Sequence, residues 1–274
     1  MSRNSDLWRY IKTGRKQVAG WFSRCDAHMF GLLLSEQAAI GEEGSVVEIG
    51  VHHGKSFVPL AMSNEGARCY AIDIFERQDL NVDLSGKGDR DRFIQNIRKF
   101  GLDPDGVVVD ARPSTEVSSE DILGSVGPAR FFHIDGGHTL DAVTNDIRLA
   151  DAVLAEGGIV AIDDLFRPEW PDVSAGFFSW YFASPGNLVP FAMGQNKTYL
   201  CRPAARARYQ EVLRSDRFLA CLFSKEYDGW CGHMLVFHNF PRAEWKIRTR
   251  ISNYLKIYNP DLFYALNRLR SKAG

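Results

Sequence analysis

The chain has 274 residues, of which 45% are hydrophobic and 24% charged, with a net charge of −1 at pH 7. These values predict a soluble protein with a packed core, as one large domain or two small ones. The near-neutral charge gives no global attraction to nucleic acid, so we expect no nucleic-acid partner. No apolar run is long enough to span a bilayer, and no hydrophobic signal segment opens the sequence, which predicts a cytoplasmic protein.

The first forty residues have a helical pattern. An apolar patch at residues 29–34 could cover a sheet or a partner subunit. We therefore expect a single domain over residues 1–274, with a helical N-terminal extension over 1–40 and a core over 41–202. The N-terminal helices and the tail are candidate contacts for a homodimer.

The most informative segment is VVEIGVHHGKS, residues 46–56. It reads as a buried strand, a glycine turn and the start of a helix. Gly50 and Gly54 lack side chains where backbone must approach a ligand, and Ser56 lies where helix amides can receive an anion. A second strand follows over residues 69–73, with Asp73 at its C-terminal end. In α/β folds, an acid in this place binds the ribose of an adenosine.

The glycine spacing separates two cofactor classes. Dinucleotide enzymes use G-x-G-x-x-G, whereas here Gly50 and Gly54 are four residues apart and follow the acidic strand residue Glu48. This step resembles the first motif of class I S-adenosylmethionine-dependent methyltransferases. A nicotinamide cofactor stays as an alternative, although we find no three-glycine fingerprint and no catalytic Tyr/Lys pair. A turn that binds no ligand is a further alternative.

Strands and helices alternate from residue 45 to residue 165, which predicts a doubly wound, mostly parallel α/β sheet with helices on both faces. The expected strands are 45–50, 68–73, 106–109, 130–135 and 158–163, and the expected helices are 55–63, 89–99 and 139–155. The polar segment 76–88 follows Asp73 and is either a loop that closes over a ligand or a surface loop.

Three acids follow two of these strands. Asp135 ends the run FFHID, and Asp163 and Asp164 end the run GGIVAIDD. Because neighbouring parallel strands end at one edge of a sheet, these carboxylates can converge there. Their mutual repulsion must raise their pKa values or attract a cation, and Mg²⁺ prefers oxygen ligands of this type. The alternative is that one acid caps a helix and another faces solvent.

Together, VVEIGVHHGKS, YAIDIF, FFHIDGGH and GGIVAIDDL resemble the metal-dependent O-methyltransferases of the catechol O-methyltransferase type. The closer likeness is to the branch that methylates sugars of macrolides and other glycosylated products. The resemblance covers about residues 40–202, including a late strand pair over 190–200. The complete fold class that we expect is a seven-stranded, Rossmann-like sheet.

The resemblance also implies roles for individual residues. The cofactor S-adenosylmethionine would be bound by Glu48, Gly50, Gly54, Ser56, Asp73, Asp110, Ala111 and Asp135. Magnesium, or another divalent cation, would be bound by Asp135, Asp163 and Asp164. His138, three residues beyond the first metal aspartate, would be the general base; relatives that use an acid two residues beyond it have no counterpart here, because residue 137 is glycine. Alternatively, His138 only orients Asp135.

The expected function is therefore a Mg²⁺-assisted O-methyltransferase that methylates a hydroxyl of a sugar or glycosylated small molecule. The alternatives are a nicotinamide-dependent oxidoreductase and a non-catalytic module that binds S-adenosylmethionine. An imidazole with a pKa near 6.5 suits a base at neutral pH, and a metal ion lowers the pKa of a bound hydroxyl.

Three features are left without an assigned role in the site. His133 is expected to point into a helix layer, on the side of its strand opposite to Asp135. The aromatic residues of segment 170–181 either wall an acceptor pocket or belong to the core. The tail 242–274 carries eight Lys/Arg against two acids, which fits a basic amphipathic helix on a membrane surface or a solvated helix packed on the protein. Over residues 203–274 we expect only a strand at 234–237 and terminal helices.

Overall fold

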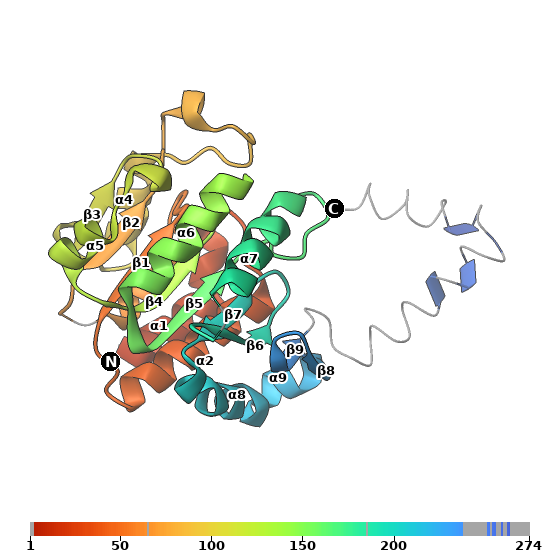
Figure 1. Ribbon diagram of the computed structural model, residues 1–274. Coiled ribbons are helices and arrows are strands. Elements are labelled where there is room, and N and C mark those ends of the chain that lie inside the picture. The colour runs from red at the N-terminus through yellow and green to blue at the C-terminus, as the bar shows by residue number, and fades with distance from the viewer. Residues whose placement is uncertain are drawn as a thin grey trace.

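The computed structural model describes residues 3–64, 66–184 and 186–237, and beyond them 251–252, 254–255, 259 and 262–263. Its centre is a nine-stranded sheet in the order β3-β2-β1-β4-β5-β7-β6-β9-β8. Helices cover both faces of this sheet (Figure 1). The predicted doubly wound α/β class is confirmed.

The first five strands are parallel and lie close to the expected ranges. They are β1 Ser45–Ile49, β2 Cys69–Ile72, β3 Val107–Asp110, β4 Ala129–Ile134 and β5 Leu154–Ile162. All residues of β1, β2 and β4 are buried. Burial on both faces is typical of inner parallel strands and explains their near-continuous apolar sequences.

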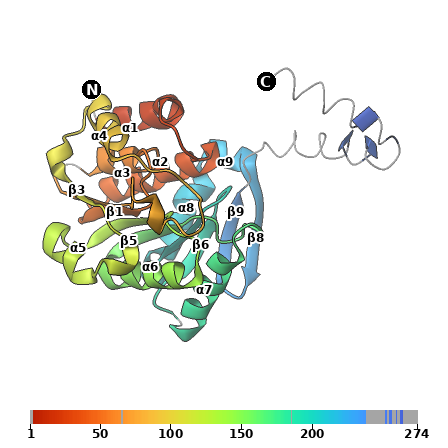
Figure 2. The same cartoon turned by 90° about the horizontal axis from the view of Figure 1, so that it is seen from above.

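The strand count corrects the prediction of seven. β6 (Val189–Met193) and β7 (Thr198–Cys201) form the expected late strand pair, which is antiparallel. A further hairpin of β8 (Phe223–Gly229) and β9 (Gly232–Phe237) extends the sheet beyond β6. Figure 2 shows this hairpin at one end of the sheet. The sequence FSKEYDG of β8 is largely polar, so its pattern did not predict a strand.

Two groups of helices form the outer layers. One face carries α1 Arg3–Lys12, α2 Arg24–Ala39, α3 Phe57–Ser63, α4 Arg90–Lys99, α8 Arg206–Ser215 and α9 Arg217–Leu222, and the other carries α5 Ser119–Val126, α6 Leu140–Val153 and α7 Pro171–Ala183. Short 3-10 turns lie at Gly14–Gln17, Gln78–Leu80, Pro104–Gly106, Ser114–Glu116 and Pro203–Ala205. Helices α5 and α7 were not predicted.

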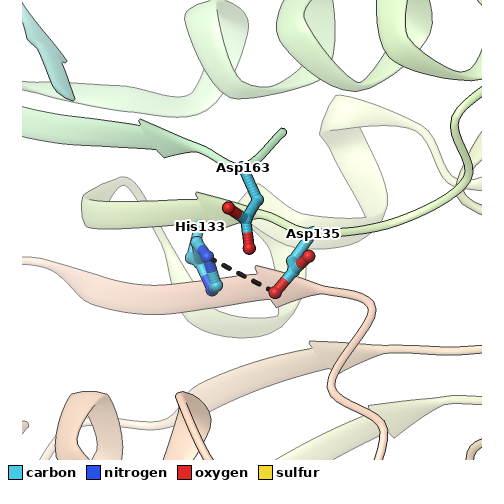
Figure 3. A group of neighbouring side chains, drawn as sticks. All are labelled: His133, Asp135 and Asp163. Atoms are coloured by element: carbon cyan, nitrogen blue, oxygen red, sulfur yellow. Dashed lines mark ion pairs between the residues drawn. The ribbon is translucent and has the colours of Figure 1, made fainter. Parts of the chain in front are cut away.

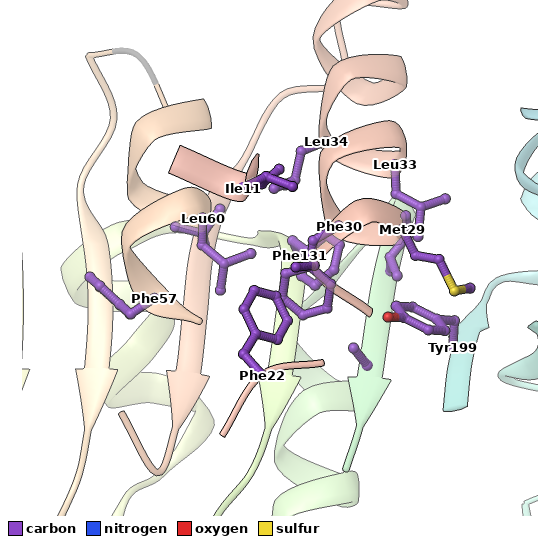
Figure 4. Packing of buried hydrophobic residues seen from close by; sticks show 14 of the residues in the cluster. Ile11, Phe22, Met29, Phe30, Leu33, Leu34, Phe57, Leu60, Phe131 and Tyr199 are labelled. Atoms are coloured by element: carbon purple, nitrogen blue, oxygen red, sulfur yellow. The ribbon is translucent and has the colours of Figure 1, made fainter. Parts of the chain in front are cut away.

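Side chains alternate along the strands and supply two separate apolar cores. Val46 and Phe131 face the layer of α1, α2 and α3, whereas Val47 and Phe132 face α5, α6 and α7. Figure 4 shows the first core, where Phe30 of α2 packs against Phe131. Because β1, β2, β4 and β5 run parallel, the residues that follow them lie at one edge of the sheet.

The predicted helical segment 3–40 is interrupted. After α1 and a 3-10 turn, the chain is extended and passes Gly20, which has a φ of +119°. The Ser23 side chain then accepts a hydrogen bond from the Asp26 amide and caps the N-terminus of α2. The interruption brings Ala19, Gly20 and Trp21 to the rim of the cavity described below.

The division into N-terminal extension, core and C-terminal part remains a prediction. Most of the basic tail 242–274 lies outside the described residues. Within the part of the chain that the structure describes, no helix has the length and apolarity needed to cross a membrane.

Candidate active site

A cavity of about 460 Å³ opens where β1, β2, β4 and β5 end. Parallel strands present their carboxyl ends, and the loops that follow them, at this edge of a doubly wound sheet. The predicted site residues that line the cavity are Gly50, Ser56, Asp73, Asp135, His138, Asp163 and Asp164. Glu48, Gly54, Asp110 and Ala111 are not among the residues that line it.

The turn after β1 requires glycine at its first position. Gly50 has a φ of +82°, and a Cβ atom there would lie 1.8 Å from the backbone oxygen of Asp135. The turn therefore brings the backbone of β1 against that of β4 at the floor of the cavity. Gly54 has a φ of +87°, and a Cβ there would meet the ring of Phe93 at 3.0 Å, so this glycine serves packing beneath the turn.

Asp73 is held rigidly at the end of β2. One carboxylate oxygen accepts the His52 amide at 2.7 Å, and the other accepts the Phe75 amide at 2.7 Å. Burial raises the pKa of Asp73, while these two amides act in the opposite direction. Gly88 of the loop after β2 lies so close that a Cβ atom would be 2.6 Å from Asp73 Oδ1. The predicted ribose-binding acid is thus oriented by the backbone and lines the cavity.

Glu48 lies beneath the cavity. It is fully buried, accepts a hydrogen bond from Ser56 Oγ at 2.5 Å, and has its pKa raised to about 8 by burial. A carboxyl with such a pKa is mostly protonated at pH 7. Its contact with Ser56 ties β1 to the start of α3.

The predicted cofactor-binding residue Asp110 makes hydrogen bonds within the chain. Its carboxylate accepts the Tyr70 hydroxyl at 2.7 Å and Arg112 Nε at 2.8 Å. The residues that line the cavity beyond β3 are Arg112, Pro113, Ser114 and Thr115. Any contact of Asp110 or Ala111 with a nucleobase therefore remains a prediction.

Asp135 and Asp163, the acids that directly follow β4 and β5, form ion pairs with Lys197 of the same chain. Lys197 Nζ lies 2.5 Å from Asp163 Oδ2 and 3.4 Å from Asp135 Oδ2. The Lys197 side chain is 1% exposed, and its pKa is raised because nearby Asp135 and Asp163 outweigh the effect of burial. The pKa of Asp135 is also raised, by burial and then by Asp163. Sequence reasoning gave Lys197 no role.

Asp164 turns away from the other two acids. It has a φ of +58°, which directs its side chain toward His138, with Asp164 Oδ2 3.1 Å from His138 Nε2. Asn196 Nδ2 bridges the pair by donating to Asp163 Oδ1 at 2.5 Å and to Asp164 Oδ1 at 2.7 Å. Burial would raise the pKa of Asp164, but its hydrogen bonds with His138 and Asn196 lower it.

His133 corrects one expectation. It lies on the same side of β4 as Asp135, because residues two apart on a strand share a face. Its Nε2 is 3.9 Å from Asp135 Oδ2, and Figure 3 shows His133, Asp135 and Asp163 pointing toward one another. Among the described residues these three form the group with ligand atoms close enough for a metal ion, and Asp164 is not part of it. Burial keeps the pKa of His133 well below 6.5, so the ring is neutral.

His138 is held between two carboxylates. Asp83 Oδ2 accepts the His138 backbone amide at 2.7 Å and lies 2.8 Å from Nδ1. Burial opposes protonation, but the hydrogen bonds with Asp164 and Asp83 outweigh it and raise the pKa of His138. Trp170 stacks on the imidazole, with ring centroids 4.2 Å apart and planes at 11°.

The loop 76–88 folds over this part of the sheet. It includes Asp83, and its residues 78, 80–83, 85, 86 and 88 line the cavity. Of the two alternatives for this loop, its position is consistent with a loop that covers a ligand, although no sequence pattern singled out Asp83. Of the aromatic segment 170–181, Trp170 lines the cavity, whereas Phe177 and Trp180 belong to the core.

Comparisons with known proteins agree with this architecture. Residues 47–165 match the family described as a methyltransferase domain. A search among curated proteins gives no match. The solved O-methyltransferase NovP aligns with 64% of this chain and 79% of its own, at 13% identity and a TM-score of 0.51, which shows a shared fold.

Two further solved structures align at lower TM-scores. A putative O-methyltransferase from Klebsiella pneumoniae covers 72% of this chain and 89% of its own, at 14% identity and a TM-score of 0.49. CalS11, described as a TDP-rhamnose 3'-O-methyltransferase in calicheamicin biosynthesis, covers 73% of this chain and 92% of its own, at 15% identity and a TM-score of 0.47.

Proposed function

We propose that this chain, which carries a methyltransferase domain over residues 47–165, transfers the methyl group of S-adenosylmethionine to a hydroxyl of a small-molecule or glycan acceptor. The predicted methyltransferase family is confirmed for these residues, and its sugar-methylating branch remains a prediction. The observation that carries the proposal is one cavity that joins the Gly50 turn, the oriented Asp73 and the His138 imidazole.

The residues present fit the cofactor. Gly50 lines the cavity, and a Cβ there would overlap the Asp135 backbone, so the turn packs directly on the segment after β4. Asp73 keeps lone pairs for the ribose hydroxyls while two backbone amides fix its orientation. When bound, S-adenosylmethionine supplies a methyl group that its sulfonium already activates. The chain must then position an acceptor hydroxyl and remove its proton.

His138 is the proposed general base. Asp83 contacts Nδ1, so Nε2 is the nitrogen that takes the hydroxyl proton, with the acceptor hydroxyl replacing Asp164 Oδ2 in the 3.1 Å contact that Nε2 makes in this structure. Asp164 lies beside Nε2 and stabilises the imidazolium that forms. Trp170 fixes the plane of the ring and, as an aromatic surface in the cavity, can also stack on a sugar or phenol acceptor.

The acceptor class is proposed to combine a polar, hydroxylated part with an apolar part. The cavity rim carries Trp21 and Val82, which are 75% and 81% exposed, and Leu84, 83% exposed, lies beside Trp21 along the adjoining groove. Exposed apolar side chains at a site favour an apolar ligand surface. A sugar attached to an apolar group fits both the polar floor and this rim.

Magnesium assistance is a prediction that the side chains do not favour. All three expected ligands line the cavity, but Asp164 is directed at His138 and a lysine lies between Asp135 and Asp163. We therefore derive no step through a metal ion.

Calorimetry with S-adenosylmethionine and with NAD tests the proposal directly. We expect S-adenosylmethionine to bind and NAD not to bind, and labelled methyl groups to reach a hydroxyl in a panel of nucleotide sugars, glycosides and phenols. Asp73→Asn should weaken S-adenosylmethionine binding by about 10-fold or more, since a charge-assisted hydrogen bond contributes about 1.5–3 kcal/mol. Asp105→Asn, at an exposed acid away from the cavity, is the matched control. Binding of NAD without S-adenosylmethionine would exclude the proposed function in favour of an oxidoreductase.

A further inference from the structure

We propose that Lys197 is the resident cation of the acid group formed by Asp135 and Asp163, and that it takes the place there of a divalent metal ion. The inference rests on the proposed methyl transfer for its functional meaning: the reaction then requires no added metal. Lys197 neutralises the charge of the two carboxylates and holds them in position. It is a positioning residue and does not touch substrate.

Strand pairing places Lys197 at the acids. β7 runs antiparallel to β5, and Thr198 is the partner of Ile162. In an antiparallel pair the residue before Thr198 therefore lies beside the residue after Ile162, which is Asp163. The Gly194 amide donates to the Lys197 carbonyl at 2.8 Å and closes the β6–β7 turn. The backbone thus holds the lysine next to Asp163 as part of the sheet.

The ammonium group is enclosed by acceptors. Lys197 Nζ is 2.5 Å from Asp163 Oδ2 and 3.4 Å from Asp135 Oδ2, and it lies 5.8 Å from the centre of the Phe22 ring. Its side chain is 1% exposed. A buried ammonium is retained only when it is paired, so this contact is part of the folded structure rather than a chance surface pair.

The position of Lys197 is incompatible with the expected metal site. A divalent ion bound by Asp135 and Asp163 would lie within a few ångströms of the ammonium, and like charges at such a distance in a buried site repel strongly. Both oxygens of Asp163 are also engaged, because Lys197 contacts Oδ2 and Asn196 donates to Oδ1. The two oxygens of Asp164 contact Asn196 and His138. The chain's own donors thereby occupy oxygens of both acids that a metal ion would require.

Lys197 also lies outside the set of residues that line the cavity, whereas Asp135, Asp163 and Asn196 line it. The lysine therefore acts from behind the carboxylates. Its ammonium group fixes the orientation of the two carboxylates toward the acceptor and offsets their negative charge. Proton removal is left to His138.

Electron paramagnetic resonance of Mn²⁺ provides the test, with methyl transfer measured separately in excess chelator. For the wild-type protein we expect no stoichiometric Mn²⁺ binding and unchanged turnover in the chelator. Lys197→Met keeps the length of the side chain and removes its charge. We expect this variant to gain a bound Mn²⁺ and to lose about 10–100-fold in kcat, the usual effect of losing a group that orients site residues.

Lys16→Met, at an exposed position, is the control and should neither gain Mn²⁺ nor lose activity. Lys197→Arg should restore the metal-free state, which a merely structural defect would not predict. Stoichiometric Mn²⁺ in the wild type, or turnover lost in chelator, overturns the inference even if Lys197→Met does not fold. A folded Lys197→Met that binds no Mn²⁺ overturns it as well. Failure of S-adenosylmethionine to bind in calorimetry refutes the proposed function instead, since the Mn²⁺ measurements do not depend on that ligand.

Discussion

The pairing of His138 with Asp83 gives the imidazole a defined chemical state. Asp83 holds both the backbone amide and Nδ1, and Asp164 faces Nε2. Both contacts favour the protonated ring and raise its pKa above the ordinary value of 6.5. A general base must be neutral to accept a proton, so activity falls as pH decreases through this raised pKa.

We expect Asp83→Asn to move the acid limb of the kcat/KM profile to lower pH. The substitution removes a negative charge that favours imidazolium, which lowers the pKa of His138.

His138→Ala should lower kcat by roughly 10²–10⁴-fold and leave S-adenosylmethionine affinity unchanged. The measurements are the pH profile of kcat/KM and calorimetry.

His233→Ala is a suitable control, because this histidine pairs with Asp228 on the β8–β9 hairpin away from the cavity. An acid limb that does not move in Asp83→Asn would show that Asp83 does not set the pKa of the base. A near-wild-type rate in His138→Ala would remove His138 from that role.

The sequence identified some of these residues and missed others for a physical reason. Asp135 and Asp163 follow apolar strands, so a local pattern located them, and the family resemblance supplied His138. Lys197 and Asp83 reach the site through tertiary structure alone. The register of β7 against β5 fixes the lysine, and the fold of an irregular polar loop fixes the aspartate. Neither position has a periodic signal.

At the scale of elements, the β1–α3 turn controls the geometry of the site. Gly50 combines a left-handed φ with a close approach to the Asp135 carbonyl. The two requirements are separate: the first concerns the backbone angle, and the second concerns contact with a neighbouring strand.

Gly50→Ala should therefore destabilise the protein by roughly 3 kcal/mol or more, since a Cβ atom would overlap backbone that cannot move cheaply. Gly41→Ala is the matched control: Gly41 has a φ of +69°, but a Cβ there meets no atom within 4 Å. This control should show only the backbone penalty of about 1–2 kcal/mol. Chemical denaturation gives both values, and equal losses in the two variants would contradict the close-contact argument.

Elements were predicted where one pattern dominated the sequence. The buried strands β1, β2 and β4 have continuous apolar runs, and α6 has apolar residues at helical spacing. Helix α7 was obscured because its sequence is apolar on most sides, begins at Pro171 and follows a turn-rich segment that contains Pro168. Strand β8 was obscured for the opposite reason, because it is mostly polar and depends on pairing with β9.

At the scale of the whole molecule, the doubly wound sheet divides the protein into two cores and brings several carboxyl groups into apolar surroundings. Asp146 of α6 is 0% exposed, and burial raises its pKa to about 7 despite hydrogen bonds with Ser114 and Asn145. Its Oδ2 atom has no hydrogen-bond partner among the described residues. This acid is outside the proposed catalytic group, so its effect on stability can be separated from activity.

The direction of the pH effect follows from proton linkage. In the unfolded chain the carboxyl loses its proton near its ordinary pKa of 3.8, whereas in the folded protein it does so near 7. Between these values the folded state binds the additional proton, so stability falls as pH rises toward 7. At higher pH this loss is complete, and it amounts to at most about 4 kcal/mol.

Asp146→Asn removes this titration and keeps the shape of the side chain. We expect the variant to gain stability relative to wild type as pH is raised from 4 to 8, with little of that gain at pH 4. Urea denaturation across this range measures the difference, and Asp105→Asn at an exposed position gives the background. Because both proteins retain the other buried carboxyls, their contributions cancel in the comparison. A stability difference that stays constant over the whole range would show that Asp146 does not carry a raised pKa in the folded protein.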